Sequence, residues 1–275
     1  MRKPALETWG RTDRGCVREV NEDNLVIDEE LGLLVVADGM GGHNAGEVAS
    51  SIAVSEIRDL ARRTLGGDQD IDPGGGSPGL SRRGRQLEFF VKTANTIIFR
   101  KGREGAKEYG MGTTVVAVLA DASSLTVAHV GDSRLYLLRS GVLTQLTEDH
   151  SLVGDQVRKG LLTADEASRS TLQNILTRAL GTEEDVQVDV ADHPLLEGDI
   201  LLLASDGLSK EVTDEDVRRT IVESGSPRVF VDRLVDMARD HGGHDNITIA
   251  AARVPAQGWM HIFEGLKRMV LGRGS

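Results

Sequence analysis

The sequence predicts an α+β fold, in which short apolar strands are combined with two pairs of long helices. Apolar runs rich in branched residues recur along the chain, for example at 33–37, 200–204 and 247–254. Runs of this length that are bounded by glycine or aspartate are typical of buried strands. Longer segments repeat apolar residues every three or four positions, as amphipathic helices do. Hydrophobic residues make up 39% of the 275 residues, so the chain can form a sizeable core.

Strand character runs through most of the chain. The segments that show it are 6–11, 25–27, 33–37, 113–119, 125–130, 135–138, 186–190, 200–204 and 247–254. The Gly-Asp-Ser-Arg sequence at 131–134 is typical of a tight turn, and we expect it to close a hairpin. Turn chemistry then accounts for Asp132, although a role as a metal ligand stays open. His129 is expected to be a core or sheet histidine.

Helical periodicity marks four long segments, which are 45–65, 87–103, 214–223 and 227–240. The last of them begins with proline, which suits the first turn of a helix. The polar segment 147–182 carries short helical patches at 152–159 and 164–169 and interrupts the strands, so it is a candidate flap. The glycine-rich stretch 66–84 lacks Gly-Lys-Ser/Thr and is therefore not a P-loop.

Three aspartates stand at the ends of apolar runs that lie far apart in the sequence. Asp38 follows the run 33–37, Asp206 follows Asp-Ile-Leu-Leu-Leu-Ala-Ser, and Asp245 precedes the last strand-like run. Gly39 lets the backbone approach a ligand closely. A lone Asp-Gly pair is more simply explained as a strand-to-helix turn with a capping acid. Because such aspartates recur, the pattern predicts a single metal site that folding assembles.

The polar loop before residue 25 holds three further candidates. Arg18 could bind phosphate through its planar guanidinium group. Glu22 and Asp23 could bind a metal ion directly or through water. A solvated, charged loop is the simpler interpretation, and composition alone favours it.

Composition excludes several classes of function. The chain has 32 Lys and Arg against 43 Asp and Glu, a formal net charge of −11. This argues against nucleic acid as the main partner and suits an acidic site that divalent cations neutralise. Cys16 is the only cysteine, so no internal disulfide can form and a reducing, cytoplasmic location is expected. We expect neither a signal peptide nor a transmembrane segment.

An ordered set of motifs resembles the metal-dependent serine/threonine protein phosphatases, the PPM or protein phosphatase 2C family, in its bacterial style. The motifs are RxxNEDN, VVADGMGGHNAGE, GMGTT, HVGDSR, LTEDHSL, LLLASDGL and HDNIT, and they span about residues 8–254. The resemblance implies a four-layer α-β-β-α sandwich of two antiparallel sheets, flanked by helix pairs. The helices at 45–65 and 87–103 would form one outer layer, and those at 214–223 and 227–240 the other.

The resemblance also implies a centre of two manganese or magnesium ions. Asp38 would bridge both ions, and Gly39 would offer its backbone carbonyl to one of them. Asp206 and Asp245 would bind the other ion. A water activated between the two ions would attack phosphorus in line, without a phosphoenzyme.

Four more residues receive roles by the same resemblance. Glu22 would support the ion that Gly39 binds, and Asp23 would act through bound water. Arg18 matches the family's phosphate-binding arginine. Asn246 would orient the neighbouring ligand.

Two positions depart from the family pattern. Met40 stands where many eukaryotic members have a histidine that serves as general acid, and His43, three residues on, more simply caps or packs a helix start. Tyr109, beside Glu108, stands where an aspartate that helps to hold a third ion is expected. A third ion is therefore in question.

The function expected is hydrolysis of phosphoserine and phosphothreonine in proteins, with substrates of a serine/threonine kinase as partners. A catalytically weak homologue that binds phosphoproteins as a regulatory module is the alternative, and a hydrolase of small phosphates is a third possibility. Residues 1–255 are expected to form the phosphatase domain. The basic, amphipathic tail 256–275 would pack on that domain, bind a partner or lie on a membrane surface.

Overall fold

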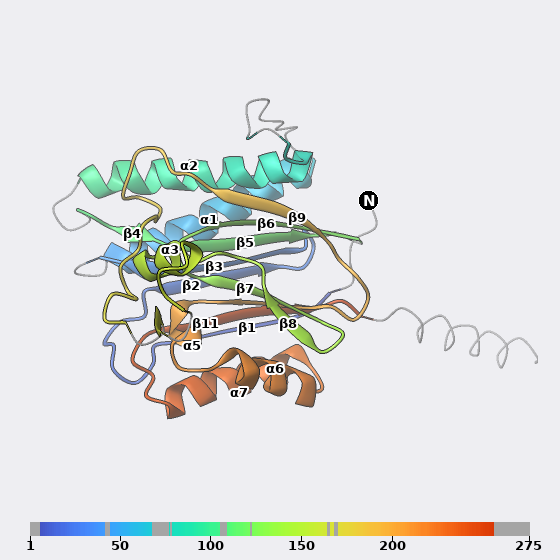
Figure 1. Cartoon of the computed structure of the whole chain (residues 1–275). Helices are drawn as coiled ribbons and strands as arrows, with labels where there is room; N and C mark the ends of the chain where they lie inside the picture. Colours follow the sequence, from blue (N-terminus) through green and yellow to red (C-terminus); the bar gives the residue numbers. More distant parts are fainter. Residues whose placement is uncertain are drawn as a thin grey trace, which may run out of the picture.

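Two antiparallel sheets stacked face to face form the centre of the computed structural model, which describes residues 6–41, 45–67, 77, 79–104, 109–121, 123–163, 166–167 and 170–255 (Figure 1). The first sheet has the strand order β1 (Glu7–Asp13), β11 (Ile247–Arg253), β10 (Ile200–Ala204), β7 (Arg134–Arg139) and β8 (Val142–Gln145). The second has the order β2 (Asp23–Asp28), β3 (Leu33–Met40), β5 (Val115–Ala120), β6 (Ser124–Val130) and β9 (Asp189–Pro194), and β4 (Gly112–Thr113) pairs with the end of β3.

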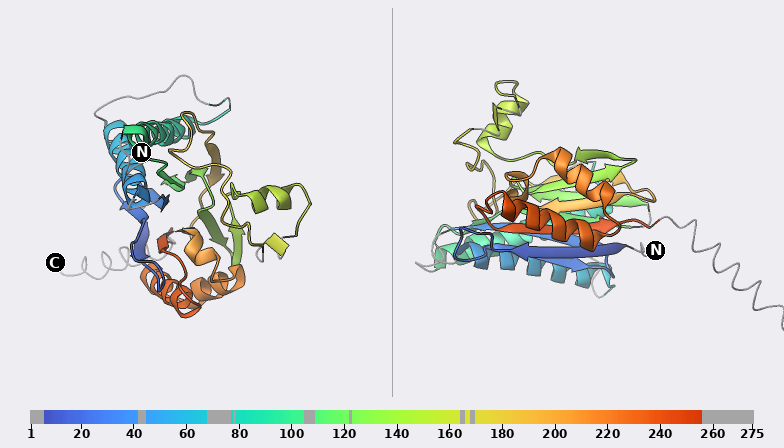
Figure 2. Two further views of the ribbon diagram at one scale, coloured as in Figure 1. Left: turned by 90° about the vertical axis from the view of Figure 1, so that its left-hand side faces the viewer. Right: turned by 90° about the horizontal axis from the view of Figure 1, so that it is seen from below.

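A pair of helices covers the outer face of each sheet. Helices α1 (Ala45–Leu65) and α2 (Arg82–Glu104) pack on the second sheet, and α6 (Asp214–Glu223) and α7 (Pro227–Asp240) pack on the first (Figure 1). The expected four-layer α-β-β-α sandwich is thus confirmed. The short helix α3 (Leu152–Arg158) projects from the sandwich, as both views of Figure 2 show, within the segment expected to be a flap.

Alternation along the strands decides what faces the space between the sheets. On β3, Leu33, Val35 and Ala37 pack toward α1 and α2, whereas Leu34 and Val36 belong to the core between the sheets. Because side chains on a strand alternate with a period of two, the next even-numbered residue, Asp38, continues the inner row. On β10, Leu201 and Leu203 face the same inner core, and Ser205 continues that row. The inner core therefore ends in polar side chains at this end of the sandwich.

The prediction that residues 131–134 close a hairpin is wrong. Strand β6 pairs with β5 and β9 in the second sheet, whereas β7 pairs with β10 and β8 in the first. The Gly-Asp-Ser-Arg segment therefore crosses from one sheet to the other. The hairpin in this region joins β7 to β8, through Ser140 (φ 51°) and Gly141 (φ 80°). Two successive residues with positive φ match the tight turn that suits twisted strands.

Other boundaries shift without changing the architecture. The strand expected at 186–190 begins at Asp189, and α2 begins at Arg82, before the expected residue 87. Strand β8 and the four-residue helix α5 (Asp206–Ser209) were not expected. His129 lies on β6 with 6% of its surface exposed, as expected for a sheet histidine.

Several expectations fall outside the described residues: His43, Glu108, parts of 164–169 and the tail 256–275. In the part of the chain that the structure does describe, no helix is both long and apolar enough to cross a membrane.

Candidate metal centre

Carboxylates from both sheets meet at the polar end of the inner core. Asp38 lies near the end of β3, Asp206 opens α5 directly after β10, and Asp245 precedes β11. Asp23 opens β2, and Asp132 lies in the crossing between β6 and β7. The structure therefore brings together the three strand-end aspartates that the sequence pattern singled out, and it adds two more carboxylates.

Asp23 and Asp38 stand directly opposite each other in the β2–β3 pair. Opposed side chains in antiparallel strands have Cβ atoms about 4.5–5.5 Å apart, so two negative charges in these positions repel each other. Ser205, from the first sheet, donates its hydroxyl hydrogen to Asp23 Oδ2 across 2.7 Å and accepts from the Thr248 amide. This contact ties the two sheets together at the site.

Burial and mutual repulsion make the ionised carboxylates costly in the absence of a cation. Burial, and then the charges of Asp23, Asp206, Asp132 and Asp245, raise the pKa of Asp38 well above its usual range. Burial is also the main cause that raises the pKa of Asp23 and of Asp132 to about 7. Groups with strongly shifted pKa values that share one cleft are typical of functional sites.

The same carboxylates offer free oxygens. Asp23 Oδ1 and Asp206 Oδ1 are buried and have no hydrogen-bond partner among the residues that the structure describes. Buried polar atoms in proteins are normally paired, so two orphaned carboxylate oxygens at one site need an explanation. Hard divalent cations prefer oxygen ligands of this kind and would offset the repulsion. The residues present therefore fit manganese or magnesium.

Glu22 and Gly39 hold the start of α1 against β3. The Gly46 amide donates to Glu22 Oε1 over 3.1 Å, and the Gly39 amide donates to the Glu22 carbonyl over 3.1 Å. A Cβ atom on Gly39 would lie 2.1 Å from the Gly46 carbonyl oxygen. Only glycine fits here, because both neighbours are backbone. Glu22 and Gly39 therefore lie together at the start of α1, and their roles as ligands stay a prediction.

Arg18 lies in the loop that leads to Glu22, and Asn246 forms hydrogen bonds with the backbone of that loop. The Arg18 guanidinium pairs with Asp245 Oδ2 at 2.9 Å, and 51% of the Arg18 side chain is exposed. Asn246 is buried, and its Oδ1 accepts from the Glu22 amide over 2.8 Å. Its amide group donates to the carbonyls of Arg14 and Val20. Asn246 therefore fixes the backbone that carries Arg18 and Glu22.

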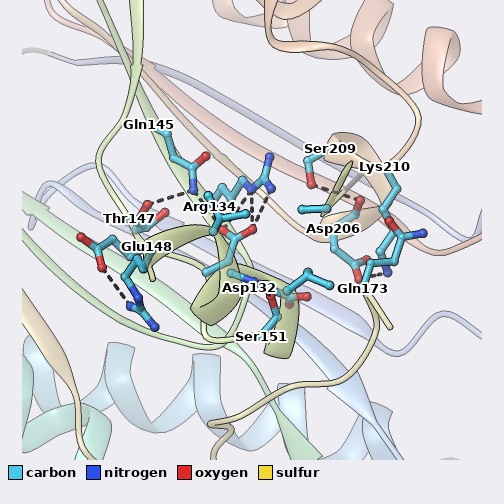
Figure 3. Close-up of a pocket in the computed structure, with 16 residues that line it drawn as sticks. Asp132, Arg134, Gln145, Thr147, Glu148, Ser151, Gln173, Asp206, Ser209 and Lys210 are labelled. Atoms are coloured by element: carbon cyan, nitrogen blue, oxygen red, sulfur yellow. Dashed lines mark hydrogen bonds and ion pairs between the residues drawn. The ribbon is translucent and has the colours of Figure 1, made fainter. Parts of the chain in front are cut away.

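A pocket of about 440 Å³ opens beside the carboxylates, between α3 and the end of the sandwich. Figure 3 shows Asp206, Ser209 and Lys210 on one side of it, with Gln145, Thr147 and Glu148 on the other. Asp132, 8% exposed, lines this pocket too. Val153 and Val157 of α3 supply an apolar wall. The pocket therefore lies between the carboxylates and the segment expected to be a flap.

Sequence reasoning favoured turn chemistry over a metal role for Asp132 and did not consider Lys210, and both residues line the pocket at the site. Asp132 was explained by turn chemistry because 131–134 was interpreted as a hairpin. It nevertheless follows a buried strand closely, like Asp38 and Asp206, and that signal could have found it. Lys210 stands four residues after Asp206, a spacing that brings opposite charges together on a helix, but no helix was expected at 206–209.

The two residues that depart from the family pattern differ in their exposure to solvent. Met40 is half-buried and pairs with Gly112 in the β3–β4 register. Tyr109 is 78% exposed. Whether Tyr109 affects a third ion stays a prediction.

A second group of potential ligands, His129, His150 and Asp189, has ligand atoms within 4.8 Å of one another. Its polar atoms are already engaged. His150 Nδ1 accepts from the Gly131 amide, and His150 Nε2 lies 3.2 Å from Asp189 Oδ2. Asp189 also pairs with Arg178 at 2.6 Å. These contacts favour a structural role, in which His150 supports the backbone next to Asp132.

Comparisons with known proteins agree with this geometry. The profile of the family described as "Protein phosphatase 2C" matches residues 17–246. The serine/threonine phosphatase stp of Listeria monocytogenes is 38% identical over 244 residues, which are 87% of this chain and 92% of that protein. The serine/threonine protein phosphatase PstP of Mycobacterium tuberculosis is 38% identical over 252 residues, 90% of this chain but 45% of PstP.

Solved structures give the same result. The catalytic domain of PstP, crystallised with two manganese ions, superimposes on this chain with a TM-score of 0.77 at 35% identity. The match covers 91% of this chain and 99% of the PstP domain. The Streptococcus agalactiae serine/threonine phosphatase superimposes with a TM-score of 0.79 at 34% identity, over 90% and 99% of the two chains.

The fold and the carboxylate cluster define an α-β-β-α sandwich protein with a site suited to divalent ions. Since the family profile and the relatives cover most of its length, the chain belongs to the protein phosphatase 2C family.

Proposed function

We propose that this protein hydrolyses phosphoserine and phosphothreonine in other proteins, with two manganese or magnesium ions bound by its carboxylates. The observation that supports this most directly is the convergence of Asp38, Asp206 and Asp245 at one end of the sandwich, with Asp206 Oδ1 buried and unpaired. The presence of two manganese ions in the related PstP catalytic domain supports the ion count.

The metal ligands proposed are those that the resemblance of the sequence to the family implies. Asp38 would contact both ions, the Gly39 carbonyl and Glu22 would serve one, and Asp206 and Asp245 the other. Asp23, opposite Asp38, would act through water. When bound, such ions would activate water for attack on phosphorus and offset the charge that develops there. The protein's own part is to hold the carboxylates in place.

Arg18 is proposed to bind the phosphate group of the substrate. Its side chain is half exposed and lies against Asp245, so its guanidinium can reach a phosphate at the site's entrance. A guanidinium group presents several donors in a plane, which suits phosphate oxygens. An Arg18→Lys substitution keeps the charge but loses the paired donors, and we expect it to raise KM for a phosphopeptide while Mn²⁺ binding is retained.

Phosphate release from a phosphothreonine peptide tests the proposal. We would compare the protein with added Mn²⁺, with excess chelator, and as the Asp206→Asn variant. Asp59→Asn, at a solvent-exposed aspartate on α1, is the matched control. Release that requires Mn²⁺, that Asp206→Asn abolishes and that Asp59→Asn retains supports the enzyme. Free phosphoserine, assayed in parallel, reports whether small phosphates are equally good substrates.

The opposite result would favour the regulatory module. If the intact protein with Mn²⁺ binds the phosphopeptide without releasing phosphate, the catalytic proposal is wrong. The substrates proposed are phosphoproteins that a serine/threonine kinase produces. Because Cys16 is the only cysteine, we propose that the protein works in a reducing compartment such as the cytoplasm.

A further inference from the structure

Lys210 reaches back to the carboxylate cluster from the first residue after α5. Asp206 opens this helix and Lys210 follows its last residue, so the two residues lie one turn apart. The Lys210 ammonium group contacts Asp206 Oδ2, and the Lys210 amide donates to the Asp206 carbonyl over 2.9 Å. Only 22% of the lysine side chain is exposed. The side chain is therefore directed toward the site and away from bulk solvent.

Asp132 lies on the same side of the centre. Asp132, Asp206 and Lys210 all line the pocket beside α3 (Figure 3). The Lys210 ammonium group contacts Asp206 directly, and Asp132 lines the same pocket. The positive charge therefore lies beside both carboxylates.

The other cations of this region are engaged elsewhere. Arg134 also lines the pocket, but it forms a two-pronged pair with Asp149, at 3.0 and 2.7 Å, and contacts the Tyr136 hydroxyl. Arg18 pairs with Asp245, on another part of the cluster. Among the described residues, Lys210 is the cation whose charged group contacts the Asp206 carboxylate.

We propose that Lys210 is a tethered cation that occupies the position beside Asp132 and Asp206 and keeps a further divalent ion out of it. An ammonium group is a compact point charge that competes with a metal ion for the same carboxylate oxygen. The inference rests on the divalent-ion centre proposed above, and it concerns the outer edge of that centre. On this proposal the number of ions bound depends on Lys210, which lies at the carboxylates, whereas Tyr109 is 78% exposed.

Metal binding to the chelator-treated 275-residue chain tests this role directly. Mn²⁺ stoichiometry would be measured by equilibrium dialysis with metal analysis, and affinity by titration calorimetry. In Lys210→Asp, three carboxylates replace two carboxylates and an ammonium group, and we expect one more Mn²⁺ per chain than in the unsubstituted protein. In Lys210→Gln, loss of the competitor should tighten the weakest Mn²⁺ equilibrium about tenfold. Lys210→Arg keeps the charge and should keep the original stoichiometry.

Lys92 provides a matched control. It lies on α2, four residues after Glu88, and its ammonium group contacts Glu88 at 3.1 Å. The pair thus repeats the spacing of Asp206 and Lys210 outside the carboxylate cluster. Lys92→Asp should leave Mn²⁺ stoichiometry and affinity unchanged, and thermal unfolding of each variant confirms that it is folded.

The outcomes separate the two proposals. If the unsubstituted protein binds no Mn²⁺, the centre itself is wrong and the role of Lys210 is overturned with it. If the unsubstituted protein binds two ions but Lys210→Asp gains none and Lys210→Gln binds no more tightly, the centre stands and the inference about Lys210 fails.

Discussion

Asp23 and Asp38 face each other across the β2–β3 pair, with both carboxylates on the side where the inner core ends. A sheet built for stability alone would not oppose two aspartates, since like charges in this position are destabilising. Ser205 supplies one hydrogen bond to Asp23, and Asp23 Oδ1 has no partner. The opposed pair therefore destabilises the folded protein until a cation binds. This effect on stability can be measured without any substrate.

Substitution of one member of this pair should stabilise the metal-free protein. Asp38→Asn keeps the shape and removes a charge, and we expect the free energy of unfolding to rise by about 1 kcal/mol at pH 8 in chelator. Thermal unfolding should move up by roughly 2–4 °C. Saturating Mn²⁺ should then stabilise the original protein but not the variant. An unchanged midpoint in chelator together with an undiminished Mn²⁺ effect would contradict this account.

The stability of the metal-free protein should depend on pH in the direction opposite to that produced by an aspartate whose pKa an ion pair lowers. The pKa of Asp23 is raised from 3.8 to about 7, chiefly by burial. Between about pH 4 and 7 the folded protein holds a proton that the unfolded chain has lost, so the free energy of unfolding falls as pH rises through this window. Unfolding by denaturant at several pH values, in chelator, measures the slope.

Asp23→Asn should flatten that slope, whereas Asp59→Asn should not. Saturating Mn²⁺ should reverse it, because metal ligands must be deprotonated to bind. A slope that is the same in Asp23→Asn and in the original protein would show that other groups cause it.

Gly39→Ala should damage both stability and metal binding. The new Cβ atom would lie 2.1 Å from the Gly46 carbonyl oxygen and 2.5 Å from that of Glu22. We expect a loss of about 3 kcal/mol and weaker Mn²⁺ binding, because β3, α1 and Glu22 must separate. Gly225→Ala, where the added atom meets nothing within 4 Å and φ is not in the left-handed region, should change stability little. Denaturant unfolding and calorimetry of the two variants give the comparison.

Asn246 has a counterpart in Asn95 that separates stability from metal binding. Asn95 is buried on α2, donates to the carbonyls of Glu183 and Glu184, and accepts from the Gly181 amide. Asn246 likewise donates to two backbone carbonyls, those of Arg14 and Val20, and accepts from one backbone amide, that of Glu22. Both alanine variants should lose about 2 kcal/mol of stability, because backbone groups are left unpaired. Only Asn246→Ala should weaken Mn²⁺ binding, by about 10–100-fold.

If Asn95→Ala weakens Mn²⁺ binding as much as Asn246→Ala does, the effect is a general consequence of lost stability. The calorimetric titrations would be done at 10 °C, where both variants are expected to remain folded.

Local sequence was sufficient for most of the elements. The long helices and the inner strands were predicted within a few residues, because their apolar periodicity is strong. The same pattern marked Asp38, Asp206 and Asp245, since each adjoins a buried run. The loop before residue 25 was less informative. Composition favoured a solvated loop, yet Asp23 is 4% exposed and faces Asp38.

The errors concern which strands are neighbours. The segment 131–134 has the composition of a hairpin turn, but β6 and β7 pair in different sheets. Turn chemistry is similar whether the next strand folds back or crosses over, so the sequence could not separate these outcomes. Turn chemistry was favoured for Asp132 for that reason, and Lys210 was overlooked because the short helix α5, which brings it one turn from Asp206, was not expected.

By itself, the sequence determined the types and order of the elements, the acidic balance, the carboxylates at strand ends and the motifs of the family. The tertiary structure decided which carboxylates share one site, which pair is opposed, and which lysine is directed at them. The physical reason is that strand periodicity is local and is written in neighbouring residues. The meeting of Asp23, Asp38, Asp132 and Asp206 depends instead on how two sheets stack and where the chain crosses between them.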